Sequence, residues 1–540
     1  MFGCGKVKAD LREVRADIPR KLADDDGRVN EILSDKHKTL GILLSLTAGA
    51  LLVHGYHPYA EDAEIYLSGV EKVLHPGLFP VDSEFFASHA SLTIFPNLAA
   101  LSLRVTHLPM EAGLFLWHLA SIFMLLLACW ELSGLLFSKK GLSKEGMPNE
   151  GPPNAGVRWG GVCLVAAMLT IPVAGTALYI MDQYLNPRNL VAFAAIFAVA
   201  RTLEKRYVPA ALWLAFAASV HPLMAAFAFS FCILLVGWER LEKKVASFRT
   251  LGMVTGLCWL LPFGISLDPP TSPAYHAAAM RHGFHYIQLW QWYEQLGILA
   301  PVALFWWFGR VARARQWRRL ELVCRTLIVY DLVYFSAALV VDLPARFESL
   351  ARLQPLRSLH LLYMLMFLII GGLLGEFVLK NRVWRWLALF VPLGVGMLVA
   401  QRALFPASAH IEWPGEAPKN QWAQAFVWVR DNTPVDAVFA LDPDFMQLPE
   451  EDTIGFRCLA QRSRLADTSK DSGAVSMFPP LAKEWWAQVQ AQTPWQSLRR
   501  EDFLRLRNTY GVSWVVVQQP GVAGLDCAYQ NAAVRVCRIP

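Results

Sequence analysis

Uncharged apolar stretches alternate with short polar segments along the first three quarters of the chain. Each stretch runs for roughly 15–25 residues, close to the length of a helix that crosses the hydrocarbon core of a bilayer. The pattern predicts about eleven transmembrane helices, at residues 38–56, 110–137, 159–181, 189–203, 207–220, 222–237, 250–267, 295–309, 323–342, 358–378 and 386–404. Residues 90–107 are also apolar, but Pro96, Asn97, Arg104 and His107 interrupt them. We expect an interfacial helix there.

Lys and Arg residues set the expected orientation of this helical domain. The segments richest in them are the N-terminal tail and residues 139–158, 204–206, 239–249, 310–319 and 380–385. With eleven spans all of these fall on one side, which the positive-inside rule makes cytoplasmic. Counting 90–107 as a span would move every later basic loop outside. The opposite side then receives residues 57–109, 182–188, 268–294, 343–357 and the tail from 405 onward.

The two ends of the chain are polar and differ from the helical part. Residues 1–37 are of mixed charge and lack the short apolar core of a cleaved signal peptide. Residues 405–540 return to the composition of a soluble domain, and their periodicity predicts an α/β fold. The expected elements are an amphipathic helix from Gln421, a turn at 432–434, strands at 437–441 and within 509–520, and helices at 480–492 and 498–508.

The sequence therefore predicts a polytopic α-helical membrane protein in three parts. These are a cytoplasmic tail (1–37), a transmembrane domain (38–404) whose first outer loop is 57–109, and an extracytoplasmic α/β domain (405–540).

Composition supports a membrane protein. The chain is 55% hydrophobic and only 17% charged, and its 20 Trp residues suit a protein with two membrane interfaces. A net charge of +6 gives little reason to expect a nucleic-acid partner. No CxxC or Cys/His metal spacing occurs. Cys527 and Cys537 flank a predicted hairpin in the tail, and they form either a disulfide in an oxidising compartment or two free thiols.

Acidic residues are concentrated in the first outer loop. Five carboxylates follow the first predicted span, at Glu61, Asp62, Glu64, Asp82 and Glu84. A carboxylate that is partly removed from water gains basicity, which suits a general base. Adjacent acids could also hold a divalent cation such as Mg²⁺ or Mn²⁺. The alternative is an ordinary solvated loop with helix-capping acids.

Basic and amide residues lie at the expected outer ends of later spans. The positive-inside rule disfavours Arg there, so their presence needs an explanation. One explanation is a site for a phosphate or pyrophosphate, to which Arg offers several donors. The other is contact with lipid headgroups or with acids of the tail. The residues of this group are Asp182, Arg188, His221, His285, Arg346, Arg352, Gln354 and Arg357.

Together these features resemble the GT-C superfamily, whose members are membrane glycosyltransferases that use polyprenyl-phosphate-linked sugars. The resemblance rests on the N-in first span, the acidic pair Glu61–Asp62, the interfacial helices, the span number and the outward tail. The tail segments 428–438 and 510–517 also resemble the soluble domain of several such enzymes.

The resemblance implies residue roles and partners. Asp62 first, and Glu61 second, would act as base on the acceptor or as metal ligand, and Arg357 and Arg188 would bind the lipid phosphate. The other substrate-binding candidates are Glu64, Tyr66, Asp82, Asp182, His221, His285, Arg346, Arg352 and Gln354. The donor would be a polyprenyl-phosphate-linked sugar and the acceptor a glycan, lipid or protein. We expect a bacterial inner membrane protein with its C-terminal domain outside.

Other interpretations remain open. A transporter or a non-catalytic scaffold would share the helical architecture. No internal repeat supports a transporter, but Asp331 lies in the middle of a predicted span, where an acid is usually functional. A lipid-linked glycan ligase or polymerase is a further alternative, although its large outer domain is expected between spans. The charge-dense segment 456–471 either faces the cleft and binds acceptor or is a solvated surface.

Overall fold

The structure is a computed structural model that describes residues 36–142, 148–151, 155–244, 272–342 and 345–540. The chain divides into two compact units, residues 1–49 and residues 50–540. The first described helix, Lys36–His54, begins in the first unit. Everything said below about packing and about the site concerns the second unit.

The fold is mostly helical. In the described part of the chain, seven helices are long and apolar enough to cross a membrane: Lys36–His54, Met110–Leu136 (α5), Pro222–Arg240 within α9 (Pro222–Lys244), Trp292–Ala314 (α12), Arg318–Val341 within α13 (Arg318–Asp342), Leu350–Leu379 around α14 (Leu359–Leu374), and Val383–Leu404 (α15). Three shorter helices accompany them: α6 (Ala155–Ala167), α7 (Pro187–Leu203) and α8 (Tyr207–Val220). The predicted span 250–267 lies outside the described residues.

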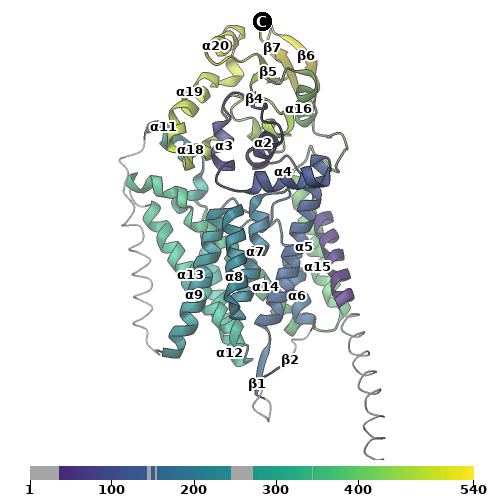
Figure 1. The fold of residues 1–540 in the computed structure, drawn as a ribbon, viewed down its shortest axis with the longest axis vertical. Helices are drawn as coiled ribbons and strands as arrows, with labels where there is room; N and C mark the ends of the chain where they lie inside the picture. Colours follow the sequence, from purple (N-terminus) through teal and green to yellow (C-terminus); the bar gives the residue numbers. More distant parts are fainter. Residues whose placement is uncertain (1–35, 143–147, 152–154, 245–271, 343–344) are drawn as a thin grey trace, which may run out of the picture. The chain divides into compact units, whose positions relative to one another are not determined.

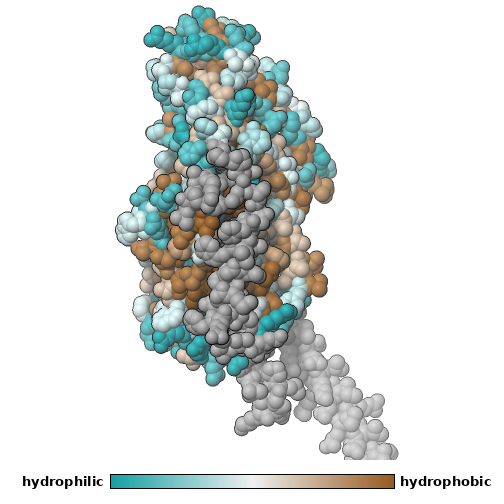
Figure 2. Space-filling model, turned by 90° about the vertical axis from the view of Figure 1, so that its left-hand side faces the viewer, coloured by the Kyte–Doolittle hydropathy of each residue, from teal (hydrophilic) through white to brown (hydrophobic). Residues whose placement is uncertain are grey.

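A band of the surface of the helical part is apolar. Helix α15 exposes Val391, Val395 and Val399, which are four residues apart and therefore lie on one face of the helix. On the face shown in Figure 2, hydrophobic residues gather over the helical part and hydrophilic residues over the end that carries the sheet. Such a band of exposed apolar side chains is what a membrane-embedded helical domain requires.

The prediction of one continuous span over 159–181 is wrong. Helix α6 ends at Ala167, and an isolated antiparallel bridge between Pro172 and Tyr179 holds the chain that follows. Pro172 has no N–H with which to continue a helix. Helix α6 instead packs closely against α14, where a Cβ on Gly160 would lie 2.3 Å from the carbonyl oxygen of Gly371. Residues 168–186 therefore form an irregular segment after helix α6 and do not continue it.

The first loop contains three helices, α2 (Ala63–Leu74), α3 (Glu84–Ala90) and α4 (Phe95–Thr106). Helix α4 has 12 residues, so it is about 18 Å long, well short of the ~30 Å hydrocarbon core. Its length agrees with the expectation that 90–107 does not span the membrane. Within the second unit, Figure 1 shows α2 and α3 between the long helices and the sheet.

The C-terminal part is a small α/β domain, as predicted. Its five-stranded sheet has the order β4-β3-β5-β7-β6, with β3 parallel to β4 and β5 and the remaining pairs antiparallel. The strands are β3 (Val438–Ala440), β4 (Ser463–Arg464), β5 (Trp514–Gln518), β6 (Asp526–Gln530) and β7 (Val534–Arg538). The α-helices of this domain are α16 (Gln421–Asn432), α17 (Phe456–Ala460), α18 (Asp471–Met477), α19 (Ala482–Gln492) and α20 (Arg500–Tyr510).

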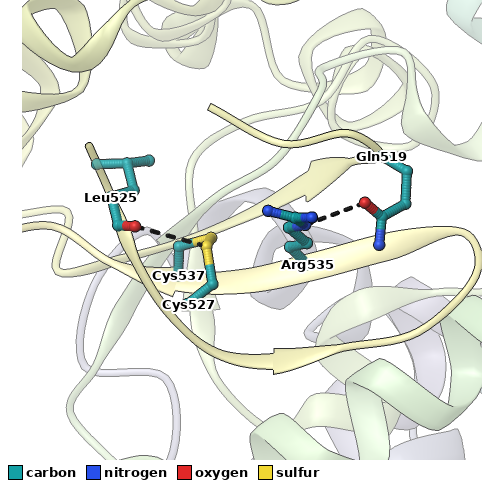
Figure 3. Close-up of a disulfide and its surroundings, with 5 residues drawn as sticks. All are labelled: Gln519, Leu525, Cys527, Arg535 and Cys537. Carbon is teal, nitrogen blue, oxygen red and sulfur yellow. Dashed lines mark hydrogen bonds between the residues drawn. A yellow bond between two sulfur atoms is a disulfide. The ribbon is translucent and has the colours of Figure 1, made fainter. Parts of the chain in front are cut away.

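Three small features complete the description. Cys527 and Cys537 face each other across the β6–β7 hairpin and form a disulfide, which confirms the first of the two alternatives (Figure 3). A second, two-stranded sheet pairs β1 (Lys139–Leu142) with β2 (Pro148–Gly151). Helix α11 (Pro273–Met280), which comes between α9 and α12 in the chain, packs against α18 and α19 of the C-terminal domain.

Candidate functional site

A cavity of about 470 Å³ lies where the helical bundle, the first loop and the C-terminal domain meet. Its size is typical of a site for a small molecule or a ligand headgroup. Polar and apolar side chains both line it. They come from residues 61–66, 89–93, 172–188, 220–223, 282–285, 354–357 and 469–477.

Most of the residues selected from sequence meet in this cavity. It is lined by Glu61, Asp62, Tyr66, Asp182, Arg188, His221, His285, Gln354 and Arg357. These side chains come from segments that are almost 300 residues apart in the sequence. Their shared location is what a common site requires, although the role of each remains a prediction.

Three selected residues lie elsewhere and one is not described. Glu64 is completely buried outside the cavity, Asp82 accepts a hydrogen bond from Gln488 (3.0 Å), and Arg352 does not line the cavity. The side chain of Arg346 lies outside the described part of the chain. Glu64 and Asp82 are in no position to contact a ligand in this cavity, because the side chains and backbone of the C-terminal domain already occupy their carboxylates.

The acidic pair stands at the start of α2. Glu61 has a φ of 55°, in the left-handed region that a residue with a side chain rarely adopts. Its backbone N–H donates to the carbonyl oxygen of Thr453 (2.8 Å), and the N–H of Asp62 donates to the hydroxyl of Tyr184 (3.2 Å). These contacts fix both carboxyl groups at the cavity wall. Unusual backbone at such a place is common at functional sites.

Two cations hold Asp62. Lys470 Nζ donates to its Oδ1 (3.0 Å) and also contacts Glu61 Oε2, while Arg188 Nη1 donates to its Oδ2 (2.8 Å). Burial acts to raise the pKa of Asp62, but Lys470 and Arg188 outweigh it and hold this pKa well below its usual range. The expectation that desolvation makes this acid more basic is therefore wrong for Asp62 in this arrangement. It is an ionised carboxylate.

Arg188 lies in the first turn of helix α7 and joins two acids. Asn186 caps the helix by accepting a hydrogen bond from the N–H of Arg188 (3.0 Å), and Pro187 occupies the first turn, where no N–H is needed. The guanidinium donates to Asp182 Oδ2 from Nη2 (3.1 Å) as well as to Asp62. Arg188 is thus paired with carboxylates.

Arg357 differs from Arg188. Among the described residues no carboxylate oxygen forms an ion pair with it, although Asp62 and Asp182 act on it from farther away, and its buried Nε has no hydrogen-bond partner there. The guanidinium lies 5.4 Å from the ring centroid of Phe284. The neighbouring Gln354 has a buried Oε1 that also lacks a partner. A cation without an acid at a cavity wall is costly to keep, and an anionic ligand would remove that cost.

Several histidines line the same cavity and are neutral. Burial, assisted by the cations Arg188 and Arg357, lowers the pKa of His221 to about 3. Burial, assisted by Lys470 and Arg357, lowers the pKa of His282 to about 3 as well. Burial also lowers the pKa of His89 to about 4. These rings therefore add hydrogen-bonding groups but no charge near neutral pH. The acids of the cavity are paired with Lys470 and Arg188, so among the described residues that line it Arg357 is a cation still available to a ligand.

A second ion network lies directly behind the acidic pair. Glu64 accepts from Arg464 (2.8 Å) and Arg457 (3.3 Å), and Asp471 accepts from Arg457 (2.8 Å) and Arg464 (3.2 Å). Arg464 also contacts Asp467. We call Glu64, Arg457, Arg464, Asp467 and Asp471 the buried network. It binds α2 to the C-terminal domain, so Glu64 has a structural position.

Three further residues that line the cavity, Lys470, His89 and His282, were not selected individually as site residues from the sequence, although Lys470 lies in the segment 456–471, for which facing the cleft was one of the two alternatives. The charge density of segment 456–471 was the available signal. Its interpretation as a solvated surface is wrong, because Arg457, Arg464 and Asp471 are at most 2% exposed. In the described residues no group of three or more His, Cys, Asp or Glu side chains is arranged to hold a metal ion.

Comparison with known proteins gives no relative from which a function could be transferred. No protein-family model matches the chain, and no curated protein matches it. Membership of the GT-C superfamily is therefore an expectation from the sequence, and the function has to be argued from the cavity.

Proposed function

We propose that the protein is a membrane glycosyltransferase that moves a sugar from a polyprenyl-phosphate donor to an acceptor. In this proposal the cavity faces the extracytoplasmic side of a bacterial inner membrane, with the C-terminal domain outside. The observation that carries the proposal is the pairing, in one cavity, of an ionised acid cluster around Asp62 with Arg357, a cation that has no acid partner among the described residues.

The cavity suits a lipid phosphate. Arg357 offers a guanidinium fork to phosphate oxygens, and neutral His282 and His285 can donate further hydrogen bonds. The rest of the wall includes the apolar side chains of Leu92, Leu178, Val220, Leu223 and Met477. A lining with a cationic spot among apolar residues matches a ligand with a charged head and a hydrocarbon tail.

The chemistry follows from this charge arrangement. The acceptor hydroxyl forms its bond to the anomeric carbon, its proton passes to a carboxylate, and the bond from that carbon to the phosphate oxygen breaks. The electron pair leaves with the lipid phosphate, which Arg357 stabilises. Asp62 is our first choice for the carboxylate and Glu61 the second. Because Asp62 is ionised and its pKa is low, it first orients the acceptor hydroxyl. It takes the proton only as the new bond to the anomeric carbon forms.

The topology supports the proposed orientation. Seven helices of the described residues are long enough to span, and the proposal counts with them the shorter helices α6, α7 and α8, as short spans, and the predicted span 250–267. With the eleven spans of the proposal, the basic segments would lie on the side of the N-terminus and the cavity on the other side. A donor with its sugar outside the cytoplasm would then reach the cavity from the bilayer.

The test is the variant Asp62→Asn in the full-length protein, reconstituted into proteoliposomes with a panel of polyprenyl-phosphate sugars. We expect transfer to be abolished while insertion and folding are retained. Asp436→Asn, which removes an exposed carboxylate of the C-terminal domain, is the matched control and is expected to stay active. A fully active Asp62→Asn protein would overturn the assignment.

Transport is the second candidate function, favoured by Asp331. This acid lies in the middle of helix α13, is 2% exposed, and its Oδ2 has no hydrogen-bond partner among the described residues. A buried acid within a span is usually functional. Solute flux in the same proteoliposomes, without any glycosyl product and abolished by Asp331→Asn, would favour a transporter.

A further inference from the structure

The Glu61–Asp62 pair has a cation of its own, supplied by the C-terminal domain. Lys470 Nζ lies between the two carboxylates, in contact with Glu61 Oε2 and 3.0 Å from Asp62 Oδ1. The Lys470 side chain is only 14% exposed. An ammonium group has three donors and no acceptor, so it can bridge two acids as a compact charge.

Buried contacts determine the position of this ammonium. Asp467 Oδ1 accepts from the backbone N–H groups of Ser469 (3.0 Å), Lys470 (2.7 Å) and Asp471 (2.9 Å), which fixes the turn before α18. Asp467 in turn contacts Arg464, and Arg464 holds Glu64. Glu64 is two residues after Asp62. The buried network thus fixes the position of Lys470 relative to the Glu61–Asp62 pair. An exposed ion pair would lack this support.

The acidic pair does not fit the divalent cation that the resemblance to GT-C enzymes suggests. Mg²⁺ would need oxygen ligands at about 2.0–2.1 Å in octahedral geometry. The position between Glu61 and Asp62 is filled by the Lys470 ammonium, and the second oxygen of Asp62 is held by Arg188 (2.8 Å). Two fixed cations within hydrogen-bond distance of one acid would repel a third.

We propose that the Lys470 ammonium is the resident cation of the Glu61–Asp62 pair and occupies the position in which a divalent metal would bridge these acids. The C-terminal domain is then part of the site itself, because its lysine completes the charge balance of the first loop. The proposal rests on the proposed function only in treating this cavity as the substrate site.

The experiment is a Mn²⁺ titration of the full-length protein in lipid nanodiscs, followed by electron paramagnetic resonance and by thermal unfolding with Mn²⁺ or with a chelator. Wild type and Lys470→Arg, which keeps the charge, are expected to bind no stoichiometric Mn²⁺ and to unfold at the same temperature in both conditions. Lys470→Met removes the ammonium, and we expect it to gain one Mn²⁺ site that also raises its unfolding temperature. The double variant Lys470→Met, Asp62→Asn is expected to lose that site.

Two results would overturn the proposal. One is a stoichiometric Mn²⁺ site in the wild type that Asp62→Asn removes, which remains measurable even if Lys470→Met fails to fold. The other is a folded Lys470→Met protein that gains no Mn²⁺, because the lysine would then not be what excludes the metal. Neither readout uses glycosyl transfer, so the proposed function can fail while this result stands.

Discussion

Two clusters of charge lie near the start of helix α2, and they differ in their access to the cavity and in whether every cation has an acid partner. In the buried network, Glu64, Arg457, Arg464, Asp467 and Asp471 are at most 2% exposed, and each is ion-paired. In the cavity, Asp62 is also paired, but the cluster borders a space of about 470 Å³ and includes Arg357, which has no acid partner among the described residues. Glu64 and Asp62 are only two positions apart in the sequence.

The difference separates charges that maintain the fold from charges that are available to a ligand. A buried ion is tolerated when partners replace its lost water, and the buried network meets that condition internally. Arg357 does not meet this condition, because none of its described neighbours accepts a hydrogen bond from its buried Nε. Proximity to a catalytic candidate is therefore a poor guide to function, as Glu64 shows, whereas an unmet hydrogen-bonding capacity at a cavity wall is a good one.

The largest expected effect comes from breaking the buried network. Arg464→Met leaves Glu64, Asp467 and Asp471 with one arginine between them, so we expect a loss of about 3–5 kcal/mol in the free energy of unfolding. Denaturant or thermal unfolding of the full chain in nanodiscs measures it. Arg500→Met, at an exposed position, is the control and should change little. Equal stability of the two variants would show that the network is not structural.

The next effect is expected at Arg357 in the cavity, where a substitution should lower activity and leave stability unchanged. Arg357→Met removes a cation that lacks an acid partner in the described structure, so stability should be unchanged or slightly higher. Loss of a charged hydrogen bond to phosphate, worth roughly 1.5–3 kcal/mol, should weaken transfer about 10- to 150-fold. Arg352→Met, five residues away and outside the cavity, is the control. If Arg357→Met lost stability as well as activity, Arg357 would be a structural charge like those of the buried network, and the two clusters would not differ in function.

Much of this arrangement was predictable from the sequence. Long apolar runs identify the spans, because length and hydropathy are local properties, and the strands at 438–440 and 514–518 follow from their buried β-branched and aromatic residues. The distribution of basic loops predicts that Asp62, Arg188 and Arg357 fall on one side of the membrane, and the side itself stays a prediction. That reasoning selected residues that the structure places in one cavity.

The remainder depends on contacts that no local pattern records. The Glu64–Arg464 pair joins residues 400 positions apart, and the Lys470 contact to Asp62 spans 408. Without these pairings, Glu64 and Asp62 are equivalent acids in one loop. The irregular segment 168–186 was missed for a different reason, because its apolar composition is that of a span and only Pro172 indicated a break.

The smallest expected effect tests an acid that belongs to neither cluster. Asp82 is partly buried and accepts from Gln488 (3.0 Å), and burial raises its pKa to about 6. Because the folded protein holds this proton more tightly than the unfolded chain, stability should fall as pH rises from about 4 to about 6 and then level off. Asp82→Asn cannot ionise, so the variant should gain stability relative to wild type over that range, by about 1–2 kcal/mol at most once partial exposure is discounted.

Unfolding temperatures of both proteins from about pH 4 to about pH 7 measure the difference, and transfer activity should stay at the wild-type level. A difference that is flat with pH would mean that the carboxyl of Asp82 is as well solvated as the exposed acids, and a loss of transfer would return Asp82 to the substrate-binding residues that its position excludes.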